Sequence, residues 1–128
     1  MVARVVLAGV LLVTLQSATA PRKGGSPDAA KVKNPIAVSA ESTAAGKRVY
    51  VRMCSRCHGA EGRGDGTASS VAVPDLTDAQ WDYGGSDGEI FAVIHDGVST
   101  DMEGYAARLS DTDIWNVVNY VRSVAPPR

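Results

Sequence analysis

Hydrophobic residues recur every three or four positions in three separate stretches of this chain. This spacing places the apolar side chains on one face of an α-helix. No stretch alternates apolar and polar residues as a half-buried strand would, so the pattern predicts an all-α fold with three to four helices. The apolar positions are Ala45, Val49, Tyr50 and Met53 in the first stretch, Ile90, Phe91, Val93 and Ile94 in the second, and Ile114, Val117, Val118 and Val121 in the third.

Each of these stretches follows a residue whose side chain can cap a helix. Ser86 and Glu89 form a capping box before the second stretch. A weaker box, Thr77 with Gln80, predicts a further short helix around Trp81. The three main helices are therefore expected from Ser42 to about Arg52, from Ser86 to Gly97, and from Ser110 to the prolines at 126–127.

The first 35 residues differ in composition from the rest of the chain. Residues 1–20 combine Arg4, an apolar run and a final Ala-Thr-Ala, an order typical of a secretory signal peptide. Pro21 follows the cleavage position and disfavours cleavage there, so either cleavage shifts by a few residues or the segment stays as a membrane anchor, although such a helix needs about 20 apolar residues. Residues 21–35 are rich in Pro, Gly, Lys and Ser and predict a flexible linker. The folded domain is expected over residues 36–128.

A domain of this size buries little apolar surface on its own. Domains shorter than about 100 residues often need a disulfide framework, a metal or another group to complete the core. A covalently attached prosthetic group would supply a large apolar body at the centre. The size of the domain is thus an independent reason to expect a cofactor.

Residues 54–58, with the sequence Cys-Ser-Arg-Cys-His, carry the chemistry that we expect of this chain. Two thiols three positions apart can each form a thioether with a vinyl group of one porphyrin, which holds the adjacent His58 under the iron. The motif therefore predicts one covalent haem c, bound through Cys54 and Cys57. Because c-type haem is attached outside the cytoplasm, this agrees with export to the periplasm.

Cys-x-x-Cys also occurs in dithiol redox sites, zinc sites and small disulfide loops. A thioredoxin-like site would require a βαβ pattern, which is not visible here. A zinc site needs about four ligands, whereas the chain holds only two cysteines and two histidines. A disulfide would leave His58 without a role. Haem attachment is favoured, and dithiol chemistry is the alternative.

The second axial ligand of a haem iron would come from Met102, or from His95, or the position would stay open. Met53 directly precedes the motif and is restricted to the side of His58. Met102 follows the second predicted helix in an irregular loop and is free to reach the other side. His95 is explained by the C-terminal dipole of its helix. The residues therefore favour Met102.

From about residue 42 to 124 the sequence resembles the small monohaem class I cytochromes c of the bacterial periplasmic type. The resemblance implies a small class I cytochrome c fold, with three to four helices around the haem and Gly46 and Tyr50 packed near Tyr120. It also implies that the Pro74 carbonyl accepts the ring N–H of His58. The matching stretches are residues 46–50, 54–59, 74–76, Met102 and residues 109–121.

These observations predict a one-electron carrier with His58 and Met102 as axial ligands, and not an enzyme. A subunit or dedicated partner of an extracytoplasmic dehydrogenase or terminal oxidase is the alternative. A haem sensor or enzyme with an open sixth site is a third possibility. Trp81 and Tyr83 either donate hydrogen bonds to the haem propionates or serve in packing.

Charge is distributed unevenly along the chain. Residues 21–63 hold nine Lys/Arg and three Asp/Glu, whereas residues 64–113 hold one Arg and eleven Asp/Glu. This asymmetry is either ordinary solvated surface or a means of orienting the molecule toward a redox protein. In the second case we expect docking on a basic face near Arg52, Arg56 and Arg63. No nucleic acid or small-molecule substrate is expected.

Overall fold

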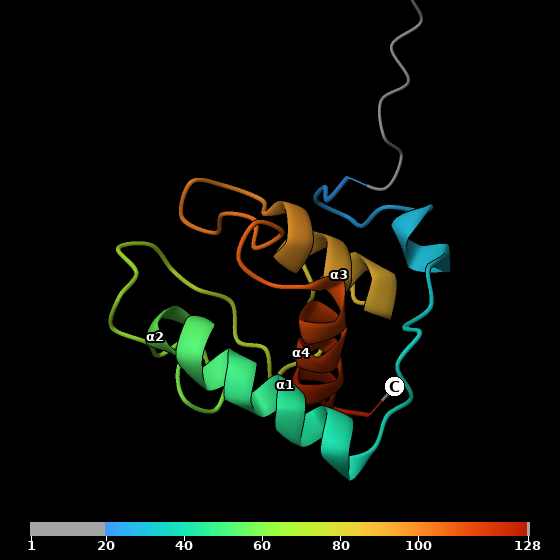
Figure 1. Ribbon diagram of the computed structural model, residues 1–128. Helices are drawn as coiled ribbons and strands as arrows, with labels where there is room; N and C mark the ends of the chain where they lie inside the picture. The colour runs from blue at the N-terminus through green and yellow to red at the C-terminus, as the bar shows by residue number, and fades with distance from the viewer. Residues whose placement is uncertain (1–19, 128) are drawn as a thin grey trace, which may run out of the picture.

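Helices and irregular loops make up the whole of the described chain (Figure 1). The computed structural model describes residues 20–127. Within these residues the only β-type pairing is a single bridge between Gly97 and Glu103, so the all-α prediction is confirmed. The elements are η1 (Ala29–Lys31, a 3-10 helix), α1 (Ala40–Met53), α2 (Ser55–His58), α3 (Asp87–Asp96) and α4 (Asp111–Val124). The predicted signal peptide, apart from its last residue, lies outside the described residues.

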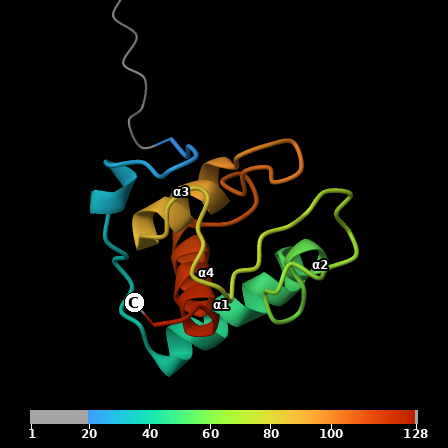
Figure 2. The ribbon, with the colours of Figure 1, turned by 180° about the vertical axis from the view of Figure 1, so that it is seen from behind.

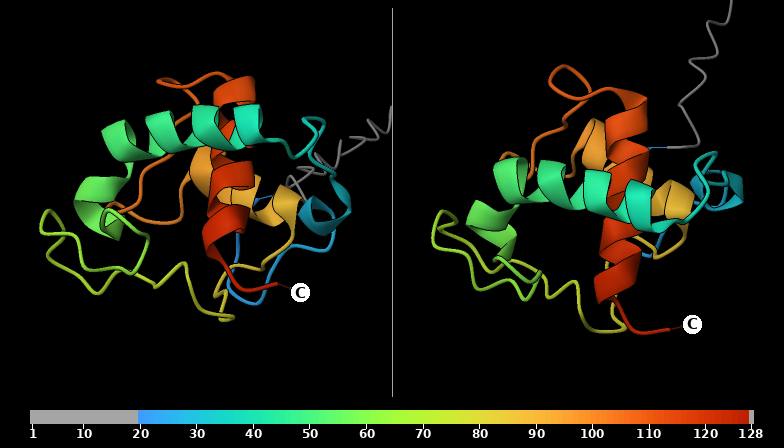
Figure 3. Two further views of the ribbon diagram at one scale, coloured as in Figure 1. Left: turned by 90° about the horizontal axis from the view of Figure 1, so that it is seen from below. Right: turned by 60° about the horizontal axis from the view of Figure 1, so that its bottom comes forward.

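Helices α1 and α4 cross at close range, as the views in Figures 2 and 3 show. Gly46 of α1 lies at the crossing, where a Cβ atom would overlap the carbonyl oxygen of Asn116 on α4. One turn further along α1, the rings of Tyr50 and Tyr120 have centroids 4.9 Å apart. The packing of Gly46 and Tyr50 near Tyr120, expected from the resemblance, is confirmed.

Apolar residues from α1, α3 and α4 form one core. Ile114 and Val118 of α4 are completely buried. Phe91 of α3 stacks on Trp115 of α4, with ring centroids 4.0 Å apart. Each large apolar side chain removed from water in this way stabilises the fold by about 1.5–3 kcal/mol. The buried members of the core are Val49, Ile90, Ile94, Leu109, Ile114, Trp115, Val117, Val118 and Val121.

The capping residues of two helices agree with the prediction. Ser86 and Glu89 form the expected capping box of α3, and Ser110 caps α4 by accepting from the amide of Asp113. The first helix begins earlier than predicted. Ser39 is its N-cap, and Ser42 is the third helical residue, whose hydroxyl accepts from the amide of Ser39.

The short helix predicted around Trp81 does not form. The carboxylate of Asp75 accepts from both the amide and the hydroxyl of Thr77, at 2.7 and 2.6 Å. Asp78 accepts from the amide of Gln80 at 2.7 Å. These local bonds between Asp side chains and the backbone stabilise turns and compete with a helix. Thr77 therefore serves an Asx turn and not the capping box that its spacing predicts.

Residues 21–35, the predicted linker, lie against the helices as an N-terminal arm (Figure 1). Ala29 of η1 is buried, and it packs so closely on α3 that a Cβ at Gly88 would overlap its carbonyl. Further along, the side-chain amide of Asn34 donates to the side-chain oxygen of Asn119 at 2.9 Å. The arm makes its contacts with small residues and polar groups. Such contacts leave no apolar periodicity in the sequence, and the composition therefore resembles that of a linker.

Candidate functional site

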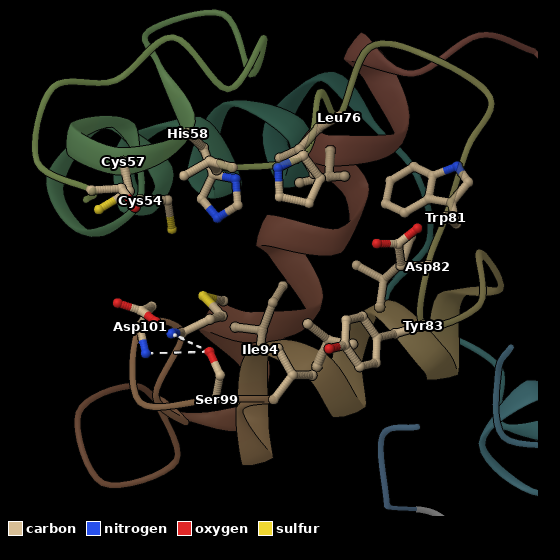
Figure 4. Close-up of a pocket in the computed structure, with 18 of the residues that line it drawn as sticks. Cys54, Cys57, His58, Leu76, Trp81, Asp82, Tyr83, Ile94, Ser99 and Asp101 are labelled. Atoms are coloured by element: carbon tan, nitrogen blue, oxygen red, sulfur yellow. Dashed lines mark hydrogen bonds between the residues drawn. The ribbon is translucent and has the colours of Figure 1, made fainter. Parts of the chain in front are cut away.

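A cavity of about 300 Å³ opens between the helices. Its walls are mainly apolar. Leu76 lines it from the segment before α3, Ile90 and Ile94 line it from α3, and Val117 and Val121 line it from α4. Figure 4 shows the cavity with the side chains that surround it. An apolar cavity next to a small core is the place where a flat apolar cofactor would complete the fold.

The two cysteines lie side by side at one end of this cavity (Figure 4). Cys54 follows the last residue of α1, Cys57 lies in the single turn of α2, and both thiols are free. Backbone bonds from the amides of Cys57 and His58 to the carbonyl of Cys54, at 3.1 and 3.0 Å, close this turn. The turn brings both thiols and the His58 imidazole to one edge of the cavity.

The Cys54 thiol is not activated as a nucleophile. Burial, with a smaller contribution from Cys57, raises the pKa of the Cys54 thiol to about 11. A dithiol redox site needs the opposite, a thiol whose pKa is lowered by neighbouring positive charge or a helix N-terminus. The environment of Cys54 therefore argues against the dithiol alternative.

His58 presents a neutral imidazole to the cavity. Burial lowers the pKa of His58, and the backbone carbonyl of Pro74 acts in the opposite direction to a smaller extent. Nδ1 of His58 is buried and has no partner of good hydrogen-bond geometry among the described residues. The Pro74 carbonyl is therefore close enough to affect the ring without being aligned with it. The neutral form of imidazole is the one that binds a metal ion.

Met102 reaches the same cavity from the loop between α3 and α4. The amide of Val98 donates to the carbonyl of Met102 at 2.9 Å, and the amide of Met102 donates to the hydroxyl of Ser99 at 3.2 Å. Gly97 begins this tight loop with φ at +76°, a conformation that favours glycine. Closure of the loop on its own backbone fixes Met102 as a cavity residue.

The competing ligand from the sequence, His95, does not line the cavity. Its Nδ1 lies 2.6 Å from a carboxylate oxygen of Asp96, and its Nε2 lies 3.7 Å from Asp111. The ring stacks on Phe91. His95 thus belongs to an acidic surface cluster at the end of α3. Met53, in contrast, lines the cavity from the end of α1.

The opposite end of the cavity is polar. Trp81, Asp82 and Tyr83 surround it, far from the cysteines, as Figure 4 shows. Lys23, on the N-terminal arm, also lines the cavity. Sequence patterns did not indicate Lys23, because nothing in the composition of the arm shows that it returns to the cavity. Tyr105 was missed as well, and its hydroxyl donates to the backbone carbonyl of Met53 at 3.1 Å.

The residues present fit a covalently attached haem. Two neighbouring thiols, a neutral imidazole and a thioether share one apolar cavity, and these are the groups that attach and ligate haem in c-type cytochromes. A zinc site has no comparable basis. Within residues 20–127, no group of three or more His, Cys, Asp or Glu side chains could hold a metal ion.

Comparison with known proteins agrees with this interpretation. Residues 41–121 match the family described as cytochrome c oxidase, cbb3-type, subunit III. The CcoP subunit of the cbb3-type cytochrome c oxidase of Rubrivivax gelatinosus is 35% identical over 91 residues, which are 70% of this chain and 28% of the relative. The chain therefore spans less than a third of that relative's length.

Solved structures show the same fold. A structure of the Kuenenia stuttgartiensis reducing HAO-like protein complex superposes with a TM-score of 0.67 at 29% identity, over 74% of this chain and 50% of the other. Cytochrome cL from the marine methylotrophic bacterium Methylophaga aminisulfidivorans gives a TM-score of 0.61 at 25% identity, over 80% of this chain and 60% of the other. The chain belongs to the cbb3-type cytochrome c oxidase subunit III family, as a monohaem cytochrome c domain with one covalent haem c.

Proposed function

We propose that this chain is an extracytoplasmic one-electron carrier whose haem iron has two protein ligands, His58 and Met102. The observation that carries the proposal is the meeting of four groups in one cavity. The thiols of Cys54 and Cys57, the imidazole of His58 and the thioether of Met102 all line it, and Met102 comes from a loop far along the chain from the other three. When bound, the haem supplies reversible one-electron chemistry at iron.

The protein's own residues would seat the cofactor and shield it. Cys54 and Cys57 would form the two thioethers, and the neutral imidazole of His58 is ready to act as a ligand without first losing a proton. Met102 would fill the remaining axial position. Its thioether would then favour the ferrous state. With both positions occupied, no site is left for a substrate.

Pro74 would orient the histidine. Nδ1 of His58 is buried without a well-aligned partner, and the Pro74 carbonyl is the backbone group that already raises its pKa. A hydrogen bond from Nδ1–H to that carbonyl would fix the tautomer and leave Nε2 for the iron. The unpaired buried nitrogen supports this role, because such a group otherwise destabilises the fold.

Absorption spectra of the ferric protein test the axial pair. We expect the weak long-wavelength band of sulfur-to-iron charge transfer in the wild type and its loss in Met102→Leu. Met53→Leu is a matched control, since Met53 also lines the cavity but is the last residue of α1, directly before the Cys-x-x-Cys-His motif. A wild type that lacks the band and binds carbon monoxide readily would contradict the proposal and favour a sensor or enzyme with an open site.

Attachment is tested separately by the colour of denatured protein. Haem held by two thioethers stays with the unfolded chain, whereas haem held only by axial ligands is extracted by acidified acetone. We expect the colour to remain with the wild type and to be lost from a variant with both Cys54 and Cys57 changed to Ala. Complete extraction of haem from the wild type would contradict the proposed role of the cysteines.

A second candidate is a subunit or dedicated partner of a terminal oxidase. It is favoured by the similarity to the CcoP subunit, although this chain spans only 28% of that relative. Arg52, Arg56 and Arg63 are exposed beside the haem-attachment turn and form the basic face on which we propose that a redox partner docks. Co-purification with a membrane oxidase, and oxygen consumption by that oxidase with the reduced protein as donor, would favour this candidate over a freely diffusing carrier.

A periplasmic location is proposed on the basis of residues 1–20, which resemble a signal peptide, and of the haem c itself. No helix in the described part of the chain is long and apolar enough to cross a membrane. The mass of the protein purified from the periplasm tests cleavage. Loss of about the first 20 residues is expected, and an intact N-terminus in the membrane fraction would indicate an anchor.

A further inference from the structure

The N-terminal arm forms part of the cavity wall, although it lies outside the region that matches the family. The amide of Gly24 donates to the carbonyl of Asp82 at 2.8 Å, and the amide of Ser26 donates to the carboxylate of Glu89 at 2.9 Å. The side chain of Lys23, directly before Gly24, lines the cavity. These bonds fix the arm directly after the place where Lys23 meets the cavity.

The path of the arm is specified by close approach of its backbone to α3. Gly25 adopts φ of +90° and packs on the buried carboxylate of Glu89, which a Cβ atom would overlap. Gly84, from the loop on the other side, approaches the same carboxylate. Glu89 also accepts from the amide of Ser86 at 2.9 Å. One buried side chain thus joins the arm, the loop before α3 and the helix itself.

Lys23 is the only lysine or arginine among the described residues that line the cavity. It directly precedes Gly24, whose amide bonds to Asp82, and this places Lys23 at the end of the cavity formed by Trp81, Asp82 and Tyr83. Among these, Asp82 carries a negative charge. This end of the cavity therefore contains hydrogen-bond donors and one acid, and Lys23 supplies its only positive charge within residues 20–127.

The chemistry of haem indicates which of its groups would meet Lys23, and this step rests on the proposed function. Thioethers to Cys54 and Cys57 hold the vinyl edge of the porphyrin at the cysteine end of the cavity. The two propionates are on the opposite edge, and they would point toward the end formed by Trp81, Asp82 and Tyr83 (Figure 4). Carboxylates that leave water require hydrogen-bond donors and a cation.

We propose that Lys23 is a cationic partner of the haem propionates, so that the N-terminal arm is a functional part of the haem site. Trp81 and Tyr83 provide N–H and O–H donors at this end, but neither carries a positive charge. Asp82 adds like charge to the propionates and increases the need for a cation. Because Lys23 is exposed at the rim, its ammonium keeps contact with water while it neutralises a propionate.

The midpoint potential of the holoprotein tests this proposal. A positive charge near the haem disfavours the ferric state, so Lys23→Gln should lower the ferrous-to-ferric ratio at a fixed electrode potential by about threefold, which is about 28 mV for one electron. Lys23→Arg should restore the wild-type ratio. Lys33→Gln is the matched control, because it removes the same charge from an exposed position of the same arm that does not line the cavity.

The salt dependence separates a charge effect from a packing defect. The difference between Lys23→Gln and the wild type should shrink as ionic strength rises, because screening weakens a partly exposed pair. Equal potentials for Lys23→Gln, Lys33→Gln and the wild type would overturn the proposal. The proposed function is tested first, on the wild type alone. It fails if the haem can be extracted or if the sulfur-to-iron band is missing. If the haem proved extractable, its orientation would no longer be fixed, and the proposal would fall as well.

Discussion

At the scale of single residues, the haem-attachment turn is tied to α1 by a tyrosine hydroxyl. The hydroxyl of Tyr50 is buried and donates to the carbonyl of Gly59 at 2.8 Å, directly after the Cys-x-x-Cys-His motif. Burial raises the pKa of Tyr50 far above its ordinary value, so the hydroxyl remains a donor at any physiological pH. The end of α1 and the end of the motif are therefore held together by one bond that is shielded from water.

Replacing Tyr50 with Phe should destabilise the holoprotein by about 1–3 kcal/mol, because the buried carbonyl of Gly59 loses its partner. Chemical denaturation followed by helical circular dichroism measures the effect. Tyr120→Phe is the control, since the two rings are neighbours and the Tyr120 hydroxyl makes no hydrogen bond among the described residues. Equal stability of the two variants would contradict the role assigned to the Tyr50 hydroxyl.

The thiol chemistry of the haem-free chain gives a second residue-scale prediction. Because burial raises the pKa of Cys54 to about 11, alkylation of a haem-free Cys57→Ser variant should be slow at pH 8 and accelerate as the pH approaches that value. The same variant in denaturant should react at the rate of an ordinary thiol. Mass spectrometry of iodoacetamide adducts measures both rates. Rapid alkylation of the folded form near pH 7 would instead indicate a dithiol redox centre.

The sequence predicted the residues with distinctive chemistry more readily than those with a supporting role. The spacing of Cys54, Cys57 and His58 has few other interpretations, and Met102 was chosen because the alternatives could be placed elsewhere. The structure brings all four to one cavity. Lys23 could not be identified, because a lysine in a polar segment is ordinary until the chain folds back. Tyr105 likewise required the three-dimensional path of the loop after α3.

At the scale of elements, caps and apolar spacing predicted three of the helices well, and the remaining errors share a cause. The helix expected near Trp81 fails because Asp75 and Asp78 bond to the following backbone, a preference that a capping-box pattern does not include. The four residues of α2 carry too few apolar positions to show a period. The contacts of the N-terminal arm depend on glycines and backbone amides, which hydrophobic patterning does not detect.

The crossing of α1 and α4 yields an element-scale prediction. Gly46→Ala should destabilise the protein by about 1–3 kcal/mol, since the new Cβ would overlap the carbonyl of Asn116 and push the helices apart. This loss opposes the gain of up to about 1 kcal/mol expected for alanine over glycine in an exposed helix. Lys47→Ala, at the exposed neighbouring position, is the control and should change stability little. Thermal unfolding of the three holoproteins measures the difference, and a stabilised Gly46→Ala variant would show that the crossing can relax.

At the scale of the whole molecule, folding reduces the charge asymmetry that the sequence displays. Residues 21–63 carry nine Lys/Arg, but four of these, namely Arg22, Lys23, Lys31 and Lys33, are on the arm. The arm packs on α3, which starts and ends with aspartates and belongs to the acidic half of the chain. The positive charge that does not lie beside the acidic half of the chain is therefore that of α1, α2 and the turn after them. These elements are on the side of the molecule opposite α3 in Figure 1.

The consequence can be measured with a redox partner at varied ionic strength. If the basic face at Arg52, Arg56 and Arg63 steers the encounter, changing all three to Gln should slow second-order electron transfer at low salt about tenfold and flatten its salt dependence. A variant with Lys31 and Lys33 changed to Gln also loses positive charge, but from the arm beside the acidic half. It should react like the wild type, because its lost charges do not face the partner. Equal slowing by both variants would mean that net charge, and not the basic face, governs the association rate.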